Sequence, residues 1–554
     1  MCAIHADAHC LEKRAFVKRA ALAFTPRVPA GNGGSMRLGI DVGGTNTDIA
    51  VVSNGAIVNT HKTPTPVDAG QGVKNAVENV LAPIAEDFPL DALQAVVIGT
   101  THFTNAFVER RRLSPVAALR LSLPSNQDVD PMLDWPEDLK RAIGGSFYTA
   151  HGGYEIDGRE SAPFDDHEVR KAVRDMRKKG LKNIAVSSTF STINDSMERA
   201  ARAVILEEIP DANVSLSSRL GGLGLIDREN AAIINASLRY IGLELVRSIG
   251  AAMEEAGVSA PVYFSQNDGS LMSANYALRH PALTFASGPA NSMRGGARLA
   301  RIDNAIVVDI GGTTTDVGVL KDGQPRELNL PGELGGVRTN FRMPDLYSTG
   351  LGGGSIVRLG DSPAIGPESV GGDLRKEALV FGGKTLTATD IAVAAGRATI
   401  GDPALVAGLP AGAVARADKL IQQKIADAID RVRINATPLP VVMVGGGRIL
   451  AAETIQGVGD LITPEFADVA NAVGAAFAQV SGAAEKTADY SRVNREEAIS
   501  EVKENAMREA VAAGADPSGL RITEVEEIPL PYAAGKMMRI RVKVVGELLA
   551  EENA

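Results

Sequence analysis

Short apolar runs alternate along the chain with stretches in which apolar residues recur at helical spacing. The runs at 92–101, 183–191 and 439–444 are typical of buried strands. The stretches 72–87 and 415–433 place their apolar residues on one face of a helix. Strands that alternate with helices in this way favour an α/β architecture with mainly parallel sheets.

One glycine-rich phrase occurs twice in the chain. Residues 38–52 read LGIDVGGTNTDIAVV and residues 307–320 read VVDIGGTTTDVGVL, so the first aspartates lie 268 positions apart (309 − 41). Each copy predicts a strand, a tight turn and a second strand, followed by a hairpin at Asn54-Gly55 or Asp322-Gly323. The long interval indicates a duplicated supersecondary unit and not a short-period repeat.

The length of the chain bears on its domain organisation. At 554 residues it is too long for one hydrophobic core, because domains usually hold about 100–200 residues. We expect a disordered leader at 1–35, a first domain at 36–225 and a second domain at 226–485. The segment 486–554 has a charged helical stretch and two strand-like runs, so we expect a small α/β appendage there.

Composition excludes several classes of function. A net charge of −10 and an aromatic content of 4% argue against nucleic-acid binding, which needs a basic face and stacking side chains. No apolar run reaches the ~18–20 residues that span a bilayer, and we expect no membrane partner. The only cysteines, Cys2 and Cys10, exclude a disulfide scaffold or a cysteine zinc site in the body of the chain. We expect a cytoplasmic protein.

The repeated phrase has the chemistry of a phosphate-binding turn. Glycines lack Cβ atoms, so consecutive backbone N–H groups can reach phosphate oxygens, and the threonine hydroxyl adds a donor. An aspartate at the end of the preceding strand can hold Mg²⁺ or orient an attacking group. Two such turns would clamp a polyphosphate from both sides, which predicts ATP and Mg²⁺ as ligands.

At these motifs the chain resembles the actin, sugar kinase and heat-shock-chaperone ATPase superfamily. More closely, over about residues 37–480, it is similar to the hydantoinase A / 5-oxoprolinase family. Further segments carry this resemblance: IGTTHFTNAFVERR at 98–111, SQNDGSLMSANYALRHPALTFASGPANS at 265–292, STGLGGGSI at 348–356 and TATDIAVAAGR at 387–397. The resemblance implies two duplicated actin-like (ribonuclease H-like) domains around a nucleotide cleft, with the last helix of the second domain returning to the first.

The resemblance also implies a set of site residues. The implied catalytic residues are Asp41, Asp309 and Thr313. Asp41 and Asp309 would be the Mg²⁺ ligands, and Asp309 would also position the attacking group. The residues implied to hold the nucleotide are Gly43, Gly44, Thr45, Asn46, Gly311, Gly312, Thr314, Gly352, Gly353, Gly354, Gly445, Gly446 and Gly447. Asp48 and Asp316 close the two phrases, and we expect them to satisfy N–H groups of the turns.

Two histidines and one asparagine are further candidates for the site. His102 and Asn105 follow the strand expected at 92–101 and are candidates for the site, although a histidine there is more often a loop residue. His151 lies in an expected hairpin and is more simply explained as structural.

The chain departs from the family pattern near the region expected to bind substrate. Tyr347 stands where the family has a histidine, the stretch 371–383 replaces a proline-glycine-proline segment, and Met197-Glu198 replaces a His–Glu pair. The large C-terminal domain of full-length A subunits is replaced by the short segment from 486. The two glycine-rich turns keep the pattern.

The resemblance predicts an ATP-dependent hydrolase. It would phosphorylate and open a cyclic amide, such as a hydantoin, 5-oxoproline or a related lactam, or would activate bicarbonate as carboxylase relatives do. The implied partners are the small-molecule substrate and a second hydantoinase-type subunit, in an oligomer. The alternatives are a small-molecule kinase of the same superfamily and a non-catalytic nucleotide-binding regulatory protein.

Overall fold

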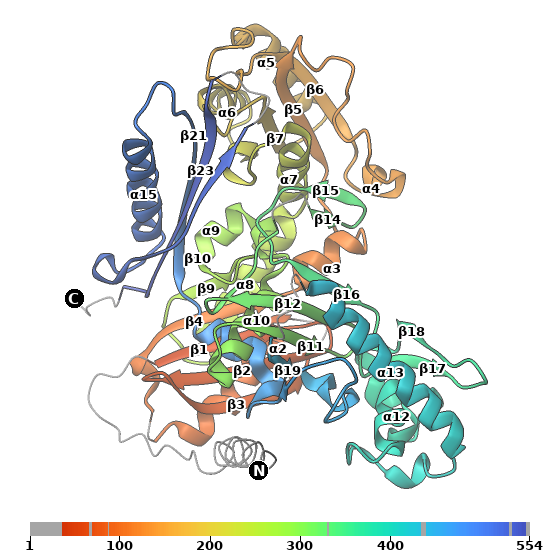
Figure 1. Cartoon of the computed structure of the whole chain (residues 1–554). Helices are drawn as coiled ribbons and strands as arrows, with labels where there is room; N and C mark the ends of the chain where they lie inside the picture. The colour runs from red at the N-terminus through yellow and green to blue at the C-terminus, as the bar shows by residue number, and fades with distance from the viewer. Residues whose placement is uncertain are drawn as a thin grey trace, which may run out of the picture.

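The computed structural model describes residues 36–65, 69–86, 88–328, 332–433, 439–530 and 535–549. The leader expected at 1–35 lies outside the described residues. The expected α/β class is confirmed, because strands and helices alternate along the chain, as Figure 1 shows. The expectation of mainly parallel sheets was wrong for the two larger sheets, which are mixed because the hairpins add antiparallel pairs.

The largest sheet has nine strands, in the order β22-β23-β21-β10-β9-β4-β1-β2-β3. In chain order these strands are β1 (Met36–Val42), β2 (Asn46–Ser53), β3 (Ala56–Pro64), β4 (Leu93–Thr100), β9 (Val262–Ser265), β10 (Leu271–Ser273), β21 (Val480–Asp489), β22 (Arg521–Pro529) and β23 (Met537–Gly546).

The first glycine-rich phrase forms the β1–β2 hairpin of this sheet. In its register Asp41 lies opposite Asp48, and β4 runs parallel to β1 on the other side. Asn54 and Gly55 join β2 to β3 with φ angles of 51° and 75°, which is the geometry that favours Asn-Gly in a two-residue hairpin turn. Residues 43–45 between β1 and β2 are called the first turn below.

Alternate residues of β2 face different helices, as expected of a buried strand. Ile49 and Val51 belong to the core that includes α2 (Ala69–Leu81) and α8 (Arg239–Glu255). Ala50 packs instead with α14 (Ala470–Ala476). The sheet is therefore covered on both faces.

The second phrase builds the same unit in a second sheet, ordered β13-β12-β11-β19-β20, with β16 paired to β12. Asp309 lies opposite Asp316, and β19 runs parallel to β11. The internal duplication is thus confirmed at the level of strand register, and residues 311–314 are called the second turn. The strands are β11 (Ala305–Ile310), β12 (Thr315–Lys321), β13 (Gln324–Pro325), β16 (Leu346–Thr349), β19 (Val441–Val444) and β20 (Leu461–Ile462).

Two helices repeat the covering pattern in this second sheet. Ile306, Val308 and Ile310 pack with α13 (Ala411–Val432). Val307 points the other way, toward α10 (Ser287–Ala300). The helices α10 and α14 thus occupy corresponding places on the two sheets, and they pack against each other.

A third sheet lies within the region expected as the first domain. Its four strands are all parallel, in the order β6-β5-β7-β8, and with their helices they form the upper part of the molecule in Figure 1. This part comprises β5 (Val116–Leu123), α4 (Glu137–Ala142), β6 (Ser146–His151), α5 (Asp166–Lys178), β7 (Asn183–Ser188), α6 (Ser196–Glu208), β8 (Asn213–Leu216) and α7 (Leu225–Ser237).

The glycine-rich region after β12 leads into a lobe on the right of Figure 1. The short pair β14–β15 lies beside α7 before this lobe begins. The elements are β14 (Gly332–Leu334), β15 (Val337–Thr339), β17 (Ser355–Arg358), β18 (Ala364–Ser369), α11 (Leu374–Glu377), α12 (Ala388–Ala394) and α13.

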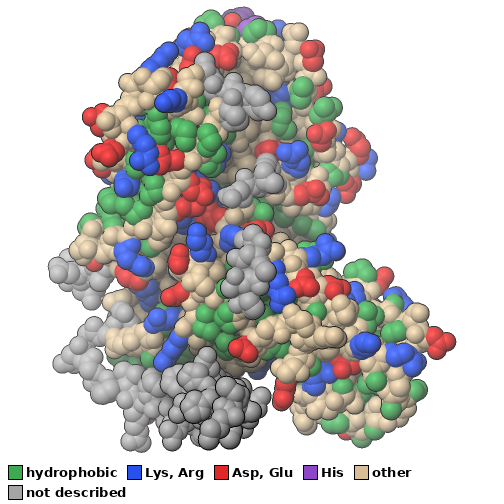
Figure 2. All heavy atoms as spheres, in the orientation of Figure 1, with side chains coloured by type: hydrophobic (Ala, Val, Ile, Leu, Met, Phe, Trp, Pro, Cys, Tyr) green, Lys and Arg blue, Asp and Glu red, His purple; other side chains and the backbone are tan. Residues whose placement is uncertain are grey.

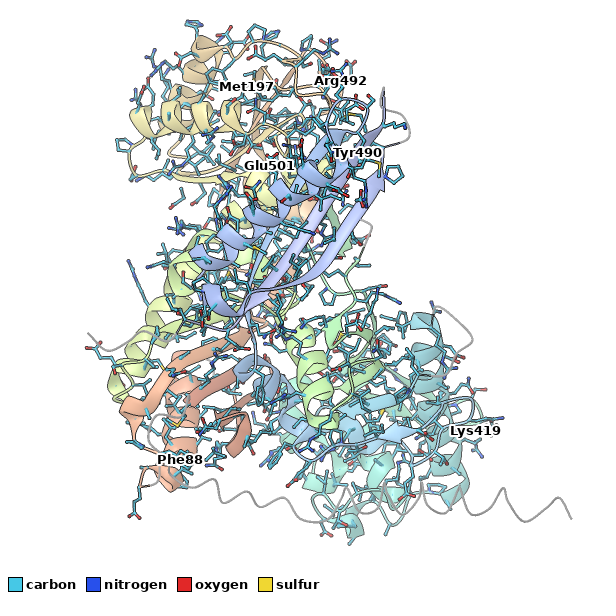
Figure 3. All side chains as sticks on the ribbon, turned by 60° about the vertical axis from the view of Figure 1, so that its left-hand side comes forward. Phe88, Met197, Lys419, Tyr490, Arg492 and Glu501 are labelled. Carbon is cyan, nitrogen blue, oxygen red and sulfur yellow. The ribbon has the colours of Figure 1, made fainter. Side chains whose placement is uncertain are left out.

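The C-terminal segment continues the nine-stranded sheet. Its helix α15 (Arg495–Ala512) covers β21 and β23, and β21 begins at Val480, before the expected boundary at 486. Figure 3 shows Tyr490 and Arg492, just after β21, at the same end of the molecule as Met197 of α6. The expected α/β tail is therefore built onto the first sheet and reaches toward the four-stranded part.

Two surface properties bear on partners. No helix among the described residues is long and apolar enough to cross a membrane. On the face drawn in Figure 2, the described basic and acidic side chains are interspersed and form no basic stripe of the kind that binds nucleic acid.

Candidate functional site

The two turns have the same backbone geometry. Asp41 is the next-to-last residue of β1, and Asp309 is the next-to-last residue of β11. The N–H of Gly43 donates to the carbonyl of Asn46 at 3.0 Å, and the N–H of Gly311 donates to the carbonyl of Thr314 at 2.9 Å. These bonds close each turn, so the next backbone N–H groups are left for other partners.

The two turns face each other in space. A Cβ built on Gly312 would lie 3.5 Å from Oγ1 of Thr45. Asp41 and Asp309 are close enough that the charge of Asp309 raises the pKa of Asp41. The duplication therefore brings two equivalent turns, 268 residues apart in sequence (309 − 41), to one place.

A third glycine loop, at 352–354, lies on the second turn. The N–H groups of Gly353 and Gly354 donate to the carbonyls of Gly311 and Gly312, at 3.0 and 2.7 Å. A Cβ on Gly352 would lie 2.6 Å from the nitrogen of Thr313. A larger residue would push this loop away from the second turn.

The fourth glycine loop, at 445–447, follows β19 on the other side of β11. A Cβ on Gly447 would lie 2.5 Å from the carbonyl oxygen of Gly311, and a Cβ on Gly445 would overlap the carboxylate of Asp309. Gly446 has open space around it. The structure thus gathers the four glycine loops expected from the sequence.

Burial and mutual repulsion dominate the electrostatics of the first turn. Asp41 and Asp48 are only 5% and 4% exposed. Burial, followed by the charges of Asp48 and Asp309, raises the pKa of Asp41 to about 7, while the Asn471 amide and Lys62 act in the opposite direction. A bound cation would relieve this repulsion.

The same effects act on the second turn. Burial raises the pKa of Asp316 to about 6, with the Ser348 hydroxyl acting against it. Burial also raises the pKa of Asp309, and a hydrogen bond from Ser292 lowers it. Several carboxyl groups are therefore held where their charges are costly, an arrangement that is frequent at functional sites.

The expected role of Asp48 and Asp316 was wrong. Asp48 forms an ion pair with Lys62, and Asp316 accepts from the Ser348 hydroxyl. The N–H groups of Gly43 and Gly311 are already satisfied by backbone carbonyls. Each closing aspartate lies on the second strand of its hairpin, directly opposite the leading aspartate, and not in the turn itself.

Two residues that sequence reasoning missed contact the leading aspartates. Nδ2 of Asn471, on α14, donates to Oδ2 of Asp41 at 2.8 Å, and Ser292, on α10, is hydrogen-bonded to Asp309. Asn471 is the one polar side chain of α14, which marks it as a buried polar residue without indicating its partner. Ser292 stands beside Asn291 and Arg294 in α10, so the sequence carries no comparable signal for it.

Of the three further candidates, Asn105 lies beside the first turn, whereas His151 lies in the four-stranded part of the molecule. Asn105 lies beside the first turn, because a Cβ on Gly44 would lie 3.6 Å from its Nδ2. His102 begins α3 (His102–Val108), and burial lowers its pKa. His151 is the last residue of β6, which pairs in parallel with β5, so the expected hairpin at this position was wrong. Its Nδ1 lies 2.9 Å from the carboxylate of Glu168.

The departures from the family pattern lie in different places. Tyr347 pairs with Val317 next to the second turn, and the guanidinium of Arg431 lies 4.9 Å from its ring centroid. In the replaced stretch 371–383, a Cβ on Gly372 would lie 3.8 Å from the carbonyl oxygen of Gly44 in the first turn. Tyr347 and the replaced stretch therefore adjoin the candidate site.

Met197-Glu198 is remote from the two turns and belongs to the upper part of the molecule (Figure 3). The carboxylate of Glu198 is fully buried and accepts from the Ser217 hydroxyl at 2.6 Å and the Ser218 N–H at 3.1 Å.

A shallow surface pocket of about 620 Å³ lies elsewhere, where β5, β7, β8 and α8 begin. It includes none of the predicted site residues. Two of its basic side chains, Arg112 and Lys182, already have carboxylate partners in Glu244 and Asp211. The candidate site is therefore defined by the four glycine loops and their aspartates.

Comparison with known proteins identifies a family whose models match the regions that contain the two turns. The family model for the hydantoinase/oxoprolinase N-terminal region matches residues 37–209, and the hydantoinase/oxoprolinase model matches residues 228–432. These ranges include both turns and the loop at 352–354.

Several relatives share this region. The caprolactamase subunit alpha of Pseudomonas jessenii is 27% identical over 398 residues, covering 67% of this chain and 56% of the relative. The acetophenone carboxylase gamma subunit of Aromatoleum aromaticum is 25% identical over 437 residues, covering 72% of this chain and 58% of the relative. The chain thus spans little more than half the length of these curated relatives.

The fold also matches solved structures. The ATP-dependent caprolactamase of Pseudomonas jessenii superposes with a TM-score of 0.73 at 20% identity, covering 93% of this chain and 88% of that one. The duplicated turns, the two family models and this shared fold agree, and the chain belongs to the hydantoinase/oxoprolinase family.

Proposed function

We propose that this chain is the ATP-using part of an enzyme that opens cyclic amides. The observation that carries the proposal is the pair of equivalent turns, with Gly312 facing Thr45. The buried Asp41 lies at the base of the first turn and the half-buried Asp309 at the base of the second. The backbone N–H groups that follow Gly43 and Gly311 in the two turns would hold the phosphates of ATP. The N–H groups of the loop at 352–354 are already donated within the protein, so this loop would support the second turn. The loop at 445–447, with open space at Gly446, would lie near the adenosine.

The residues at the turns fit a Mg²⁺ ion. Oδ1 of Asp41 is buried and has no hydrogen-bond partner, although Oδ2 is held by Asn471. The described residues contain no group of three or more His, Cys, Asp or Glu side chains that could form a metal cage. Mg²⁺ usually keeps several waters and needs only one or two carboxylates plus substrate phosphates. Asp41 and Asp309 would supply these carboxylates, and the ion would neutralise charge that develops on the phosphates.

The proposed reaction makes the amide carbon electrophilic. The amide oxygen attacks the γ-phosphorus, the bond from this phosphorus to the bridging oxygen of ADP breaks, and ADP leaves. Water then adds to the activated carbon, the ring C–N bond breaks with a proton going to nitrogen, and hydrolysis of the acyl phosphate releases phosphate. The balance is cyclic amide, ATP and two waters giving amino acid, ADP and phosphate.

In this scheme Asp309 would help to position the attacking group, and Thr313 would donate to the transferring phosphate. The substrate class rests on the relatives, because one is named as a caprolactamase subunit and the family is named for hydantoinase and oxoprolinase. The departures at Tyr347 and 371–383 adjoin the turns, so we expect a substrate that differs in shape from those of the relatives.

We also propose that a second subunit takes part, in an oligomer. The relatives are named as the alpha subunit of a caprolactamase and the gamma subunit of a carboxylase. The present chain spans only 56% of the first of these. The cytoplasmic location expected from the sequence stays a prediction.

The test is ADP formation by the purified protein, as isolated with any bound partner, in the presence of hydantoin, 5-oxoproline, caprolactam and smaller lactams. Stimulation of ADP release by one lactam, with the ring-opened acid as product, is expected. A sugar or acid that becomes phosphorylated while every lactam leaves ADP release unchanged would favour the kinase alternative instead. Stimulation by bicarbonate with a ketone would identify the carboxylase branch that the second relative represents.

A further inference from the structure

Two helices each present one hydrogen-bond donor to one of the leading aspartates. Nδ2 of Asn471 donates to Asp41 at 2.8 Å, and its side chain also bonds Asp48. Ser292 bonds Asp309 in the same way from the other helix. The Oδ1 atom of Asn471 accepts from the N–H of Ala472 at 2.8 Å, which fixes the amide with its Nδ2 toward the aspartates.

The two donors occupy equivalent positions on their helices. Asn471 precedes Gly474 by three residues, and Ser292 precedes Gly295 by three, so each donor and its glycine share one side of the helix. Gly295 and Gly474 are the points where the helices touch. A Cβ on Gly474 would overlap the carbonyl oxygen of Asn291, and a Cβ on Gly295 would overlap that of Ala470.

This contact links the two donors through rigid backbone. The distance between the helix axes is set by glycine against a carbonyl on both sides, and each donor lies three residues, ~4.5 Å along the axis, from that contact. A shift of one helix would therefore move its donor relative to the aspartate of its own sheet. The described residues supply no other hydrogen bond to the Asp41 carboxylate, and Oδ1 remains buried without a partner.

We propose that Asn471 is a positioning residue of the ATP site, which holds Oδ2 of Asp41 so that the unpaired Oδ1 would be available to a Mg²⁺ ion, with Ser292 as its counterpart at Asp309. The inference rests on the proposed function, because it assumes that ATP and Mg²⁺ bind at the turns. Nearby, Oδ1 of Asn291 is also buried without a donor. A Cβ on Gly99 would lie 2.6 Å from Oδ1 of Asp41 and 2.7 Å from Nδ2 of Asn291, so both unpaired acceptors belong to one small region.

The test separates metal coupling from nucleotide binding and from folding. The dissociation constant of a non-hydrolysable ATP analogue is measured by calorimetry with Mg²⁺ and with EDTA, on the protein as isolated. For Asn471→Ala we expect the value in EDTA to stay within about twofold of wild type, whereas the gain in affinity on adding Mg²⁺ falls by about 10-fold or more, the usual effect of removing a partner of a metal ligand. Ser292→Ala should act in the same direction.

Two further variants exclude a merely structural role. Asn471→Ser restores a hydroxyl donor of the kind used at Ser292, and we expect it to recover part of the lost Mg²⁺ dependence. Asn505→Ala, on α15, where the half-buried amide accepts a hydrogen bond from Arg508 far from the turns, should leave both constants unchanged. An unaltered Mg²⁺ dependence in Asn471→Ala, or an equal loss of affinity with and without Mg²⁺, would overturn the inference. Failure of the wild-type protein to bind the analogue at all would overturn the proposed function itself.

Discussion

Asp41 and Asp309 are acidic residues placed where an acid is costly. Both end a buried strand, and burial raises the pKa of each carboxyl, in the case of Asp41 to about 7. A protein keeps such groups when a ligand or cation compensates them. The nearby amide of Asn471 and the hydroxyl of Ser292 compensate only part of this cost.

The first prediction concerns Asp309. Asp309→Asn keeps the shape of the side chain and removes a charge that burial disfavours, so we expect unchanged or slightly higher thermal stability without ligand. ATP turnover should fall at least ~10²-fold, as removal of a group that acts on transition-state charge typically does. Asp427→Asn, on the exposed side of α13, is the matched control. Turnover near that of wild type in Asp309→Asn would remove this residue from the mechanism.

The second prediction concerns His280, outside the site. Burial, and then the charges of Arg279, Arg219 and Arg239, lower the pKa of His280 to about 4. Its ring packs against that of Tyr276, with the centroids 4.4 Å apart and the planes tilted by 45°. Because the unfolded value is about 6.5, the unfolded state takes up a proton first as the pH falls. The stability that this residue contributes is complete above pH 6.5 and is lost as the pH falls through 4.

Between pH 7 and pH 5 this linkage amounts to about 2 kcal/mol of unfolding free energy. We expect His280→Gln to lose that much less stability than wild type over the same interval in urea titrations. Equal losses in the two proteins would show that another group carries the acid sensitivity.

At the residue scale the sequence predicted the positions of the turns but not their surroundings. Asp41, Gly312 and Gly445 could be named because each belongs to a motif with a spacing of its own. The role of Asn471 could not be predicted, because a single amide in an alanine-rich helix belongs to no motif. Its role follows from the fold, which places it beside a residue 430 positions away. The mistaken role of Asp48 has a similar cause: its partner Lys62 comes from the next strand.

The helices α10 and α14 are the elements that join the two halves. Each packs on its own sheet, and each meets the other at a glycine. Close approach of this kind replaces side-chain packing with backbone contact, so the pair has little freedom to adapt to added volume.

The third prediction follows from this contact. In Gly474→Ala the added methyl group would overlap the carbonyl oxygen of Asn291, so the helices must separate and we expect a loss of about 1–3 kcal/mol in unfolding free energy. ATP-analogue binding should weaken as well, because the donors move with the helices. Gly250→Ala, inside α8 where a Cβ would meet nothing within 4 Å, should keep or raise stability. Equal stability of the two variants would contradict tight contact between α10 and α14.

Most elements with strong periodicity could be predicted. The strand at 92–101 became β4, and the helical stretch 415–433 became most of α13. The strand β21 could not be predicted, because VSGAAEKTAD has few β-branched or aromatic residues and the helical pattern that precedes it continues into its first residues. Its place is determined by tertiary pairing with Leu271 of β10 on one side and with β23 on the other.

At the scale of the whole molecule, two related sheets carry the candidate site, and other parts are attached to them. The four-stranded parallel sheet is inserted in the first half, the lobe with α12 and α13 lies in the second, and the C-terminal strands extend the first sheet (Figure 1). Sequence reasoning found the duplication because its motif repeats. It did not separate the inserted sheet, because β5 and β7 continue the same alternation of strands and helices.

The family and the shared fold make ATP-driven activation the central claim, while the chain spans just over half of its relatives. The most direct measurement is the ratio of ADP formed to amino acid released, by chromatography and mass spectrometry, with the lactam that stimulates ADP release. We expect one ADP for each ring opened, no phosphorylated product that retains the ring, and loss of both products in Asp309→Asn. Ring opening without ADP, or a phosphorylated acceptor with its ring intact, would contradict it.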